Sequence, residues 1–234
     1  MSMRFKGLLV AGFVAPLVLI VNSASAASVS GEANIAGTVT VDASSIVFNP
    51  TFVNTPGAKE TGSFAGLTGG TIMSLYGGPA TGATYVPGFI NFNAGLATPV
   101  TFDLTYIAPG VGTASGCSSS TPGSLCTPAG SPFTLLQLTS STVVASLQLN
   151  GDAYTGSPET GMSYTTGVFS TQTAVGGTLP EIIRTLGAGR AISGITYSAS
   201  FVASPVPEPA SMLLMGFGLA GTAFVARRRV SRKA

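Results

Sequence analysis

Hydrophobic and polar residues alternate with a period of two in three segments of the middle of the chain. In residues 99–107 the hydrophobic positions are Val100, Phe102, Leu104 and Tyr106. Residues 142–150 and 191–201 repeat the pattern, with Val143, Ala145, Leu147 and Leu149 in the first and Ile195, Tyr197, Ala199 and Phe201 in the second. Because successive side chains of a strand point to opposite faces, each segment is predicted to form a half-buried β-strand.

Gly-, Pro- and Ser-rich stretches separate these strands from several shorter candidates. The shorter candidates are GTVTVD, SIVF, TYVPGFINF, FTLLQL and SYTTGVFSTQ. Asn150, Gly151 and Asp152 are typical of a turn and are predicted to follow the strand over residues 142–150. Strands joined in this way favour an all-β fold, and we predict one β-sandwich or jelly-roll-like ectodomain over residues 27–204.

One segment, residues 178–189, instead has the period of a helix. Its hydrophobic side chains fall on one face, namely Leu179, Ile182, Ile183 and Leu186. Thr178 is placed to cap the helix, Glu181 to complete a capping box and Gly187 to end the helix. We expect one short helix that packs on the sheet and covers the core; the alternative is a lid or docking helix.

The first 26 residues have the pattern of a signal peptide. Two basic residues precede an uncharged apolar run over residues 7–21, which is short for a membrane span of ~20 residues. Ala24 and Ala26 supply the small side chains that signal peptidase accepts before its cleavage site. We predict cleavage after Ala26, with Ala27 as the neighbouring choice, and the alternative is an uncleaved N-terminal anchor.

Residues 205–234 contain a second hydrophobic segment, which has three parts in a fixed order. A Pro-flanked acid, Val206-Pro207-Glu208-Pro209, precedes an uncharged run over residues 210–226. At a rise of ~1.5 Å per residue, a helix over this run can just span a membrane. A basic tail over residues 227–233 follows, headed by Arg227, Arg228 and Arg229. Because arginine and lysine resist translocation, the tail is expected to stay on the cytoplasmic side and to stop the chain in the membrane.

At these residues the chain resembles the PEP-CTERM sorting domain. The resemblance rests on Val206-Pro207-Glu208-Pro209, on the run ASMLLMGFGLAG and on the triple arginine. It implies recognition by a membrane-embedded exosortase that cuts near the Pro-Glu-Pro and passes the protein to the cell surface or beyond. It also implies a Gram-negative-type bacterium that makes exopolysaccharide or biofilm matrix. The alternative is a plain single-pass membrane anchor.

Charge and composition narrow the role of the middle region. Without its two ends, the chain has three basic and seven acidic side chains, a net charge of −4, which disfavours nucleic acid and anionic lipid as partners. The chain has no histidine, which removes the serine and cysteine triads and the common zinc sites. No acidic residue stands in a catalytic or calcium-binding motif, so we expect no enzyme, no metal site and no cofactor.

The two cysteines, Cys117 and Cys126, lie in a Ser-, Gly- and Pro-rich loop between strand candidates. Two nearby cysteines of an exported chain are expected to form a disulfide. Closing so short a loop stabilises the fold by roughly 2–3 kcal/mol on the loop-entropy model.

Two functions for the middle region stay open. The first is a structural or adhesive protein of the cell surface, acting in a matrix of polysaccharide. The second is a carbohydrate-binding module that uses tyrosines as a stacking platform, since the chain has no tryptophan. The candidate tyrosines are Tyr76, Tyr85, Tyr154 and Tyr164. Several tyrosine rings that are coplanar and exposed on one sheet face favour the second function, and inward-pointing rings favour the first.

Overall fold

The computed structural model describes residues 28–55, 58–78, 80–157, 161–171, 175–205 and 216–219. The first strands are β1 (Gly31–Val41), β2 (Ser45–Phe48), β3 (Thr51–Asn54), β4 (Gly69–Ile72), β5 (Leu75–Tyr76), β6 (Gly82–Ala94) and β7 (Val100–Ile107). The remaining strands are β8 (Leu125–Cys126), β9 (Thr134–Thr139), β10 (Thr142–Thr155), β11 (Ser163–Thr171), β12 (Val175–Gly176) and β13 (Ile192–Pro205). Within residues 28–205, the described helices are α1 (Leu179–Gly187) and two 3₁₀ turns, η1 (Gly62–Phe64) and η2 (Ala114–Ser118).

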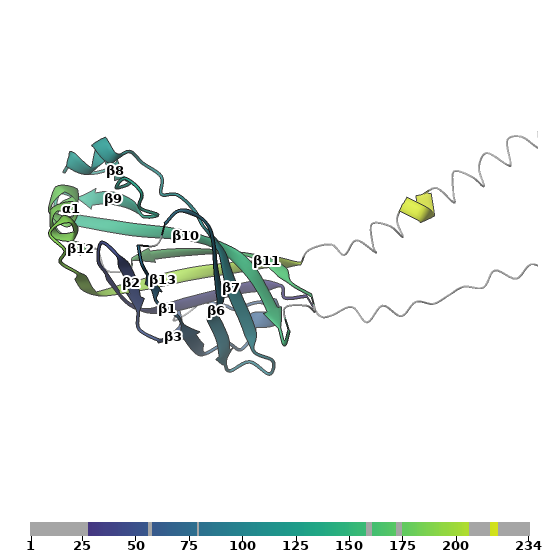
Figure 1. Ribbon diagram of the computed structural model, residues 1–234. Helices are drawn as coiled ribbons and strands as arrows, with labels where there is room; N and C mark the ends of the chain where they lie inside the picture. The colour runs from purple at the N-terminus through teal and green to yellow at the C-terminus, as the bar shows by residue number, and fades with distance from the viewer. Residues whose placement is uncertain are drawn as a thin grey trace, which may run out of the picture.

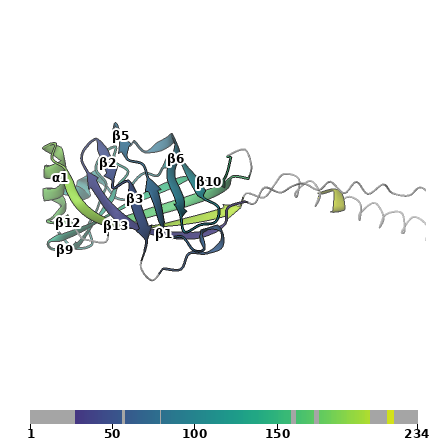
Figure 2. The same ribbon diagram turned by 90° about the horizontal axis from the view of Figure 1, so that it is seen from below.

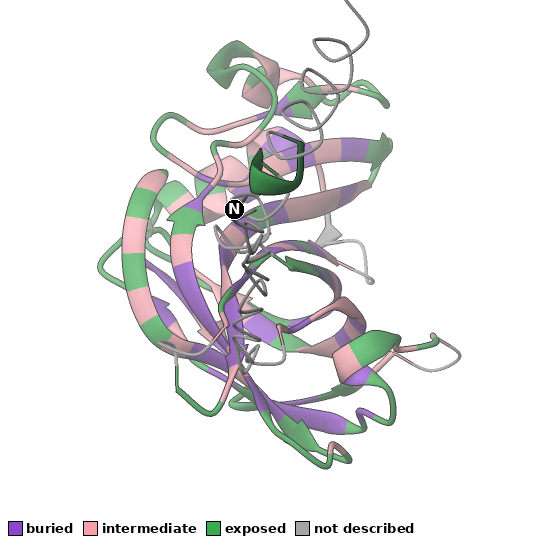
Figure 3. Ribbon diagram, turned by 90° about the vertical axis from the view of Figure 1, so that its right-hand side faces the viewer, coloured by how far each residue is buried: buried purple, intermediate pink, exposed green. Residues whose placement is uncertain are grey.

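Eight of the strands form a sheet that closes on itself. They follow one another in the order β10, β11, β13, β1, β3, β4, β6 and β7, and β7 pairs with β10 again. All of these pairings are antiparallel, and the strands curve around a common centre (Figure 3). The predicted all-β class is therefore confirmed, while the sandwich or jelly-roll arrangement is not, because the strands form one barrel.

Phenylalanine side chains fill the interior of the barrel. Eight of them are buried, namely Phe48, Phe52, Phe64, Phe89, Phe92, Phe102, Phe169 and Phe201. Neighbouring rings have centroids 5.1–6.4 Å apart, most of them in edge-to-face geometry. Such pairs add to the stabilisation that burial of their large apolar surface already provides. The alternation predicted for residues 191–201 is confirmed, since the interior also holds Ile195, Tyr197, Ala199 and Phe201.

The predicted turn at Asn150-Gly151-Asp152 is wrong, because β10 continues through it to Thr155. Gly151 sits where β10 pairs with β7, and a Cβ atom there would collide with the carbonyl oxygen of Asp103 and lie 2.7 Å from the ring of Phe102. Gly151 therefore does not form a turn. It allows two neighbouring strands to approach closely inside the sheet, which is a common reason for a glycine within a strand.

A bulge also alters the alternation predicted for β7. The register moves by one residue between Leu104 and Tyr106, so Tyr106 faces Asn150 while Leu104 faces Gly151. As a result Tyr106 is exposed and Ile107 is buried, against the expectation that Tyr106 would share the face of Phe102. An extra residue in one strand of an antiparallel pair has this effect on every following side chain.

The two ends of the barrel differ. One end is covered by α1, with β8 and β9 beside it, and at the other end the described chain begins and β13 stops (Figures 1 and 2). The pairing of Gly31 with Ala203 places the start of β1 next to the end of β13. Residue 28, where the described chain begins, and Pro205, where β13 ends, therefore lie at the same end of the barrel, opposite α1.

Candidate functional site

The residues predicted to direct export and sorting lie outside the described part of the chain. This holds for the signal-peptide residues Ala24 and Ala26, for the motif Val206-Pro207-Glu208-Pro209 and for Arg227, Arg228 and Arg229. Of the predicted span over residues 210–226, only residues 216–219 are described. Within the described residues, no helix has the length and apolar character needed to cross a membrane.

The expected disulfide joins Cys117 in η2 to Cys126 in β8, with the two Cα atoms 4.7 Å apart. Cys126 is fully buried in a second small core, together with Leu135, Val143, Leu179 and Ile182. Because η2 also contacts α1, the disulfide ties the loop after β7 to the helix that covers the barrel end.

The helix α1 has the predicted start, with Thr178 as its N-cap and a hydrogen bond of 2.9 Å from the Thr178 N–H to the Glu181 carboxylate. Its last residue is Gly187, and the glycine with positive φ that follows is Gly189. A contact that the sequence did not indicate holds its first turn: the N–H of Leu179 donates to Oε1 of the buried Gln137, at 2.8 Å. The expectation that α1 covers the core is met by Leu179 and Ile182, which are buried.

The structure separates the four tyrosines that were candidates for a stacking platform. Tyr85 on β6 and Tyr164 on β11 have exposed rings, with Tyr85 67% exposed, whereas Tyr154 on β10 is only 8% exposed. Tyr76 is 72% exposed but lies on β5, which pairs with β2, so it is not on the same strands. Tyr106 on β7 joins the outward-facing set through the bulge described above.

Two of these tyrosines, Tyr85 and Tyr154, contact a buried carboxylate, that of Asp103 on β7, which is only 4% exposed. Asp103 accepts hydrogen bonds from the N–H of Gly88 at 2.7 Å, from the hydroxyl of Tyr154 at 3.2 Å and from that of Tyr85 at 3.3 Å. The bulge in β6 between Val86 and Ile90 places the Gly88 N–H opposite Asp103. A buried carboxylate requires such donors, because burying an unpaired charge is very costly.

A second carboxylate lies directly across the sheet from the first. Asp152 on β10 is the cross-strand partner of Asp103 on β7 and, on its other side, of Tyr164 on β11. Within the described residues, no third acidic side chain completes a group of metal ligands. We call this surface the tyrosine–aspartate face; its members are Tyr85, Asp103, Tyr106, Asp152, Tyr154 and Tyr164.

The charges of the two carboxylates influence the ionisation of this face. Burial, followed by the nearby charge of Asp103, raises the pKa of Asp152. The charge of Asp103 is the main cause that raises the pKa of Tyr85, while burial is the main cause for Tyr154. Both phenols therefore stay protonated at neutral pH and act as hydrogen-bond donors to Asp103.

The sequence pattern located part of this face. The alternation over residues 99–107 put Asp103 on the polar side of its strand; in the structure its carboxylate accepts hydrogen bonds from Tyr85 and Tyr154 and is buried. The pairing of Asp103 with Asp152 depends on the register of β7 against β10, which the turn predicted at Asp152 concealed. Exposed aromatic rings can stack on the apolar face of another ring, and carboxylates beside them can accept hydrogen bonds from hydroxyl groups.

Comparison with known proteins identifies the C-terminal segment and nothing else. Neither a curated protein nor a solved structure matches the chain. A family model described as the PEP-CTERM protein-sorting motif matches residues 205–229, which include the Pro-Glu-Pro, the apolar run and the triple arginine. The chain therefore carries a PEP-CTERM sorting motif, which marks an exported protein that an exosortase processes for the cell surface or the extracellular space.

Proposed function

We propose that the barrel is a carbohydrate-binding domain that attaches the exported protein to extracellular polysaccharide, as a structural or adhesive component of a biofilm matrix. The observation that supports this role is the tyrosine–aspartate face. Two exposed rings, Tyr85 and Tyr164, lie on strands either side of the Asp103–Asp152 pair. The sorting motif supports the location, since it directs the protein to the surface or beyond.

The proposed ligand is a neutral polysaccharide. Sugar rings present an apolar face that can stack on tyrosine, and their hydroxyl groups can donate to Asp152. Acidic polysaccharides fit less well, because the face holds two carboxylates and the barrel region is net negative. The proposed role is binding without catalysis.

Binding of the exported, processed protein to an array of neutral and acidic polysaccharides from its own organism tests this proposal. We expect Tyr85→Ala and Tyr164→Ala each to weaken binding about 2- to 10-fold, the range that loss of one stacking contact gives. Tyr76→Ala is the matched control, because it removes an equally exposed ring from a different strand.

Three results would count against the proposal. If Tyr76→Ala weakened binding as much as Tyr85→Ala, the ligand would not depend on the tyrosine–aspartate face. If no polysaccharide bound, the structural or adhesive role would have to rest on contacts between protein copies. If the protein released new reducing ends from a bound polysaccharide, the absence of catalysis would be wrong.

A further inference from the structure

Tyr85 combines an exposed ring with a hydroxyl that is held in place. The residue is 67% exposed, so packing against neighbouring side chains restricts its ring only weakly. Exposed side chains that nothing holds exchange between rotamers within picoseconds to nanoseconds. The Tyr85 hydroxyl, however, donates a hydrogen bond to Oδ2 of Asp103, 3.3 Å away. This bond is therefore the interaction that can fix the direction of the Tyr85 ring.

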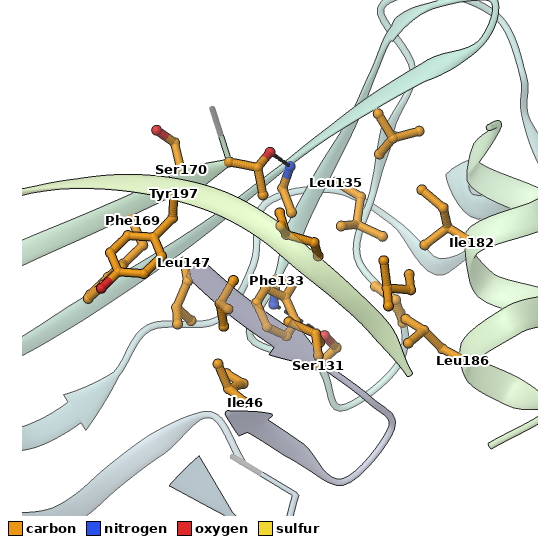
Figure 4. A pocket seen from close by; sticks show the side chains of 18 of the residues that line it. Ile46, Ser131, Phe133, Leu135, Leu147, Phe169, Ser170, Ile182, Leu186 and Tyr197 are labelled. Atoms are coloured by element: carbon orange, nitrogen blue, oxygen red, sulfur yellow. Dashed lines mark hydrogen bonds between the residues drawn. The ribbon is translucent and has the colours of Figure 1, made fainter. Parts of the chain in front are cut away.

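Tyr197, inside the barrel, shows the other way in which this chain fixes a tyrosine. It lines an apolar cavity of about 80 Å³ (Figure 4), and its ring packs against Phe48 and Phe169, with ring centroids 5.5 Å and 5.3 Å away. The residue is 2% exposed, and within the described part of the chain its buried hydroxyl has no hydrogen-bond partner. Packing alone thus holds Tyr197, whereas the exposed ring of Tyr85 depends on a hydrogen bond.

Asp103 can hold Tyr85 because its own carboxylate is fixed by two further donors. Oδ1 accepts hydrogen bonds from the Gly88 N–H at 2.7 Å and from the Tyr154 hydroxyl at 3.2 Å, which leaves Oδ2 for Tyr85. Because Asp103 is only 4% exposed, it offers almost no surface to a polysaccharide. Any effect of Asp103 on binding at this face must therefore pass through the residues that it holds.

The contact with Gly88 links Asp103 to the backbone that carries Tyr85. The register of β6 against β7 shifts between Val86 and Ile90, and Gly88 within this bulge has a φ of 61°, which favours glycine. Bulges of this kind bend a strand and redirect its side chains. Asp103 thus holds the short segment over residues 85–88 at both ends, by the hydroxyl of Tyr85 and by the N–H of Gly88.

We propose that Asp103 is a positioning residue, which holds the exposed ring of Tyr85 in one orientation before a ligand arrives. The inference rests on the proposed polysaccharide function and deepens it, because a ring that is already oriented loses less conformational entropy when a sugar stacks on it. A carboxylate suits this task, since hydrogen bonds to a charged group are roughly twice as strong as those between neutral groups. Tyr76, a ring of similar exposure whose hydroxyl no described residue holds, should by contrast move freely.

The first test measures the orientation of the ring in the processed, exported protein without any ligand. NMR scalar couplings should show one χ1 rotamer for Tyr85 and several for Tyr76. Tyr85→Phe keeps the ring and the other two hydrogen bonds to Asp103, and its ring should populate several rotamers. The proposal is overturned if the Tyr85 couplings of the original protein are averaged, or if Tyr85→Phe keeps a single rotamer.

Titration of the Tyr85 phenol, followed by ¹³C NMR, tests the contact with Asp103 separately. The pKa of Tyr85 should lie above its usual value of 10.0, mainly because of the nearby charge of Asp103. Asp103→Asn removes this charge and should lower the pKa of Tyr85. An unchanged pKa would show that the two groups do not interact in solution. If Asp103→Asn does not fold, the rotamers of Tyr85→Phe still decide whether the hydroxyl holds the ring.

The second test measures binding to the neutral polysaccharide fraction of the protein's own organism. Tyr85→Phe should bind about 2- to 5-fold more weakly than the original protein, as expected when one side chain must be immobilised on binding. Tyr76→Phe is the matched control and should bind like the original protein. In protein that already carries Asp103→Asn, Tyr85→Phe should have little further effect, because the hydroxyl acts through Asp103.

Two outcomes of the binding test have different meanings. An equal effect of Tyr85→Phe with and without Asp103→Asn would show that the hydroxyl contacts the sugar directly, and it would overturn the positioning role. If the neutral fraction does not bind while Tyr85 keeps one rotamer in the free protein, the proposed polysaccharide function fails, and the orientation of Tyr85 by Asp103 stands.

Discussion

Gly151 and Gly187 show how differently the same residue can act in this chain. Both were interpreted from the sequence as positions where an element ends. In the structure Gly151 is inside β10, where a side chain would collide with Asp103 and Phe102. Gly187 is the last residue of α1, and a Cβ atom there would meet nothing within 4 Å. Residue type alone did not distinguish close approach from a turn, because the neighbouring strand is nearly fifty residues away in the sequence.

Alanine substitutions should therefore have opposite effects at these two glycines. We expect Gly151→Ala to lower the free energy of unfolding by about 1–3 kcal/mol, the usual cost of forcing extra volume into a packed interior. Gly187→Ala should raise it by up to about 1 kcal/mol, because alanine is the better helix former. Urea unfolding of both variants checks this, and a neutral Gly151→Ala would show that β7 and β10 can separate without cost.

Two aspartates are predicted to give opposite pH dependences of stability. The pKa of Asp152 is raised above its usual value of 3.8. At a pH between these two values, the carboxyl group is protonated in the folded state and ionised in the unfolded state. Stability should then fall as the pH rises from 3.8 through the raised pKa. Asp152→Asn, which never ionises, should be more stable than the original protein at pH 7, with the difference vanishing below pH 3.8.

Asp42 provides the matched control, because hydrogen bonds from Ser44 and Ser45 lower its pKa. Its carboxylate stabilises the folded state above pH 3.8, and this contribution disappears as the pH falls through the lowered pKa. Asp42→Asn should thus be less stable than the original protein at pH 7 and equal to it in acid. Thermal unfolding across pH 2–8 measures both variants. If both substitutions changed the stability at pH 7 in the same direction, the opposite pKa shifts of Asp152 and Asp42 would be contradicted.

At the scale of elements, the sequence pattern predicted the helices and strands that depend on residues close together in the sequence. The helix over residues 178–189 was predicted with its cap, because Thr178 and Glu181 are close in sequence. The strands at residues 142–150 and 191–201 were predicted from alternation alone. The bulge in β7 and the extension of β10 were not, since both depend on the register of strands distant in sequence. The sandwich prediction failed for the same reason, because only the pairing of β10 with both β7 and β11 closes the sheet.

The disulfide should stabilise one end of the barrel more than the rest. Reduction, or the double substitution of Cys117 and Cys126 by serine, should lower the free energy of unfolding by about 2–3 kcal/mol on the loop-entropy model. Because η2 contacts α1, hydrogen exchange at the α1 amides should become faster, while the amides of β13 stay protected. Uniformly faster exchange would show that the disulfide stabilises the whole barrel. Peptide mapping without reductant checks the pairing itself.

At the scale of the whole molecule, the two ends of the barrel differ. The start of β1 and the end of β13 lie at one end, and α1 covers the other. The start of β1 and the end of β13 are neighbours, so the two described positions nearest in sequence to the predicted processing sites lie at the same end of the barrel. Cleavage after Ala26 removes nothing from β1, which begins at Gly31. Only Val206 separates the end of β13 at Pro205 from Pro207, so a cut at the Pro-Glu-Pro leaves the barrel complete.

The C-terminal segment is predicted to act as a temporary anchor in the inner membrane. Substitutions in its different parts should then cause different defects in processing and localisation. Replacing Pro207, Glu208 and Pro209 by alanine keeps the apolar run and the arginines, so the protein should insert but accumulate uncut. Deleting the exosortase should have the same effect. Cell fractionation and immunoblotting measure both. Processing of this variant like the original protein would leave a plain membrane anchor as the better interpretation.

Replacing Arg227, Arg228 and Arg229 by alanine should produce a different defect. The apolar run and the Pro-Glu-Pro remain, but most of the charge that resists translocation is lost. The chain should therefore be translocated completely across the inner membrane without being cut by the sorting enzyme. Its released form should keep residues 207–234. Mass spectrometry of the released protein distinguishes the cases, because sorting removes this segment while slippage retains it. Retention of the arginine variant in the inner membrane would show that the apolar run alone stops translocation.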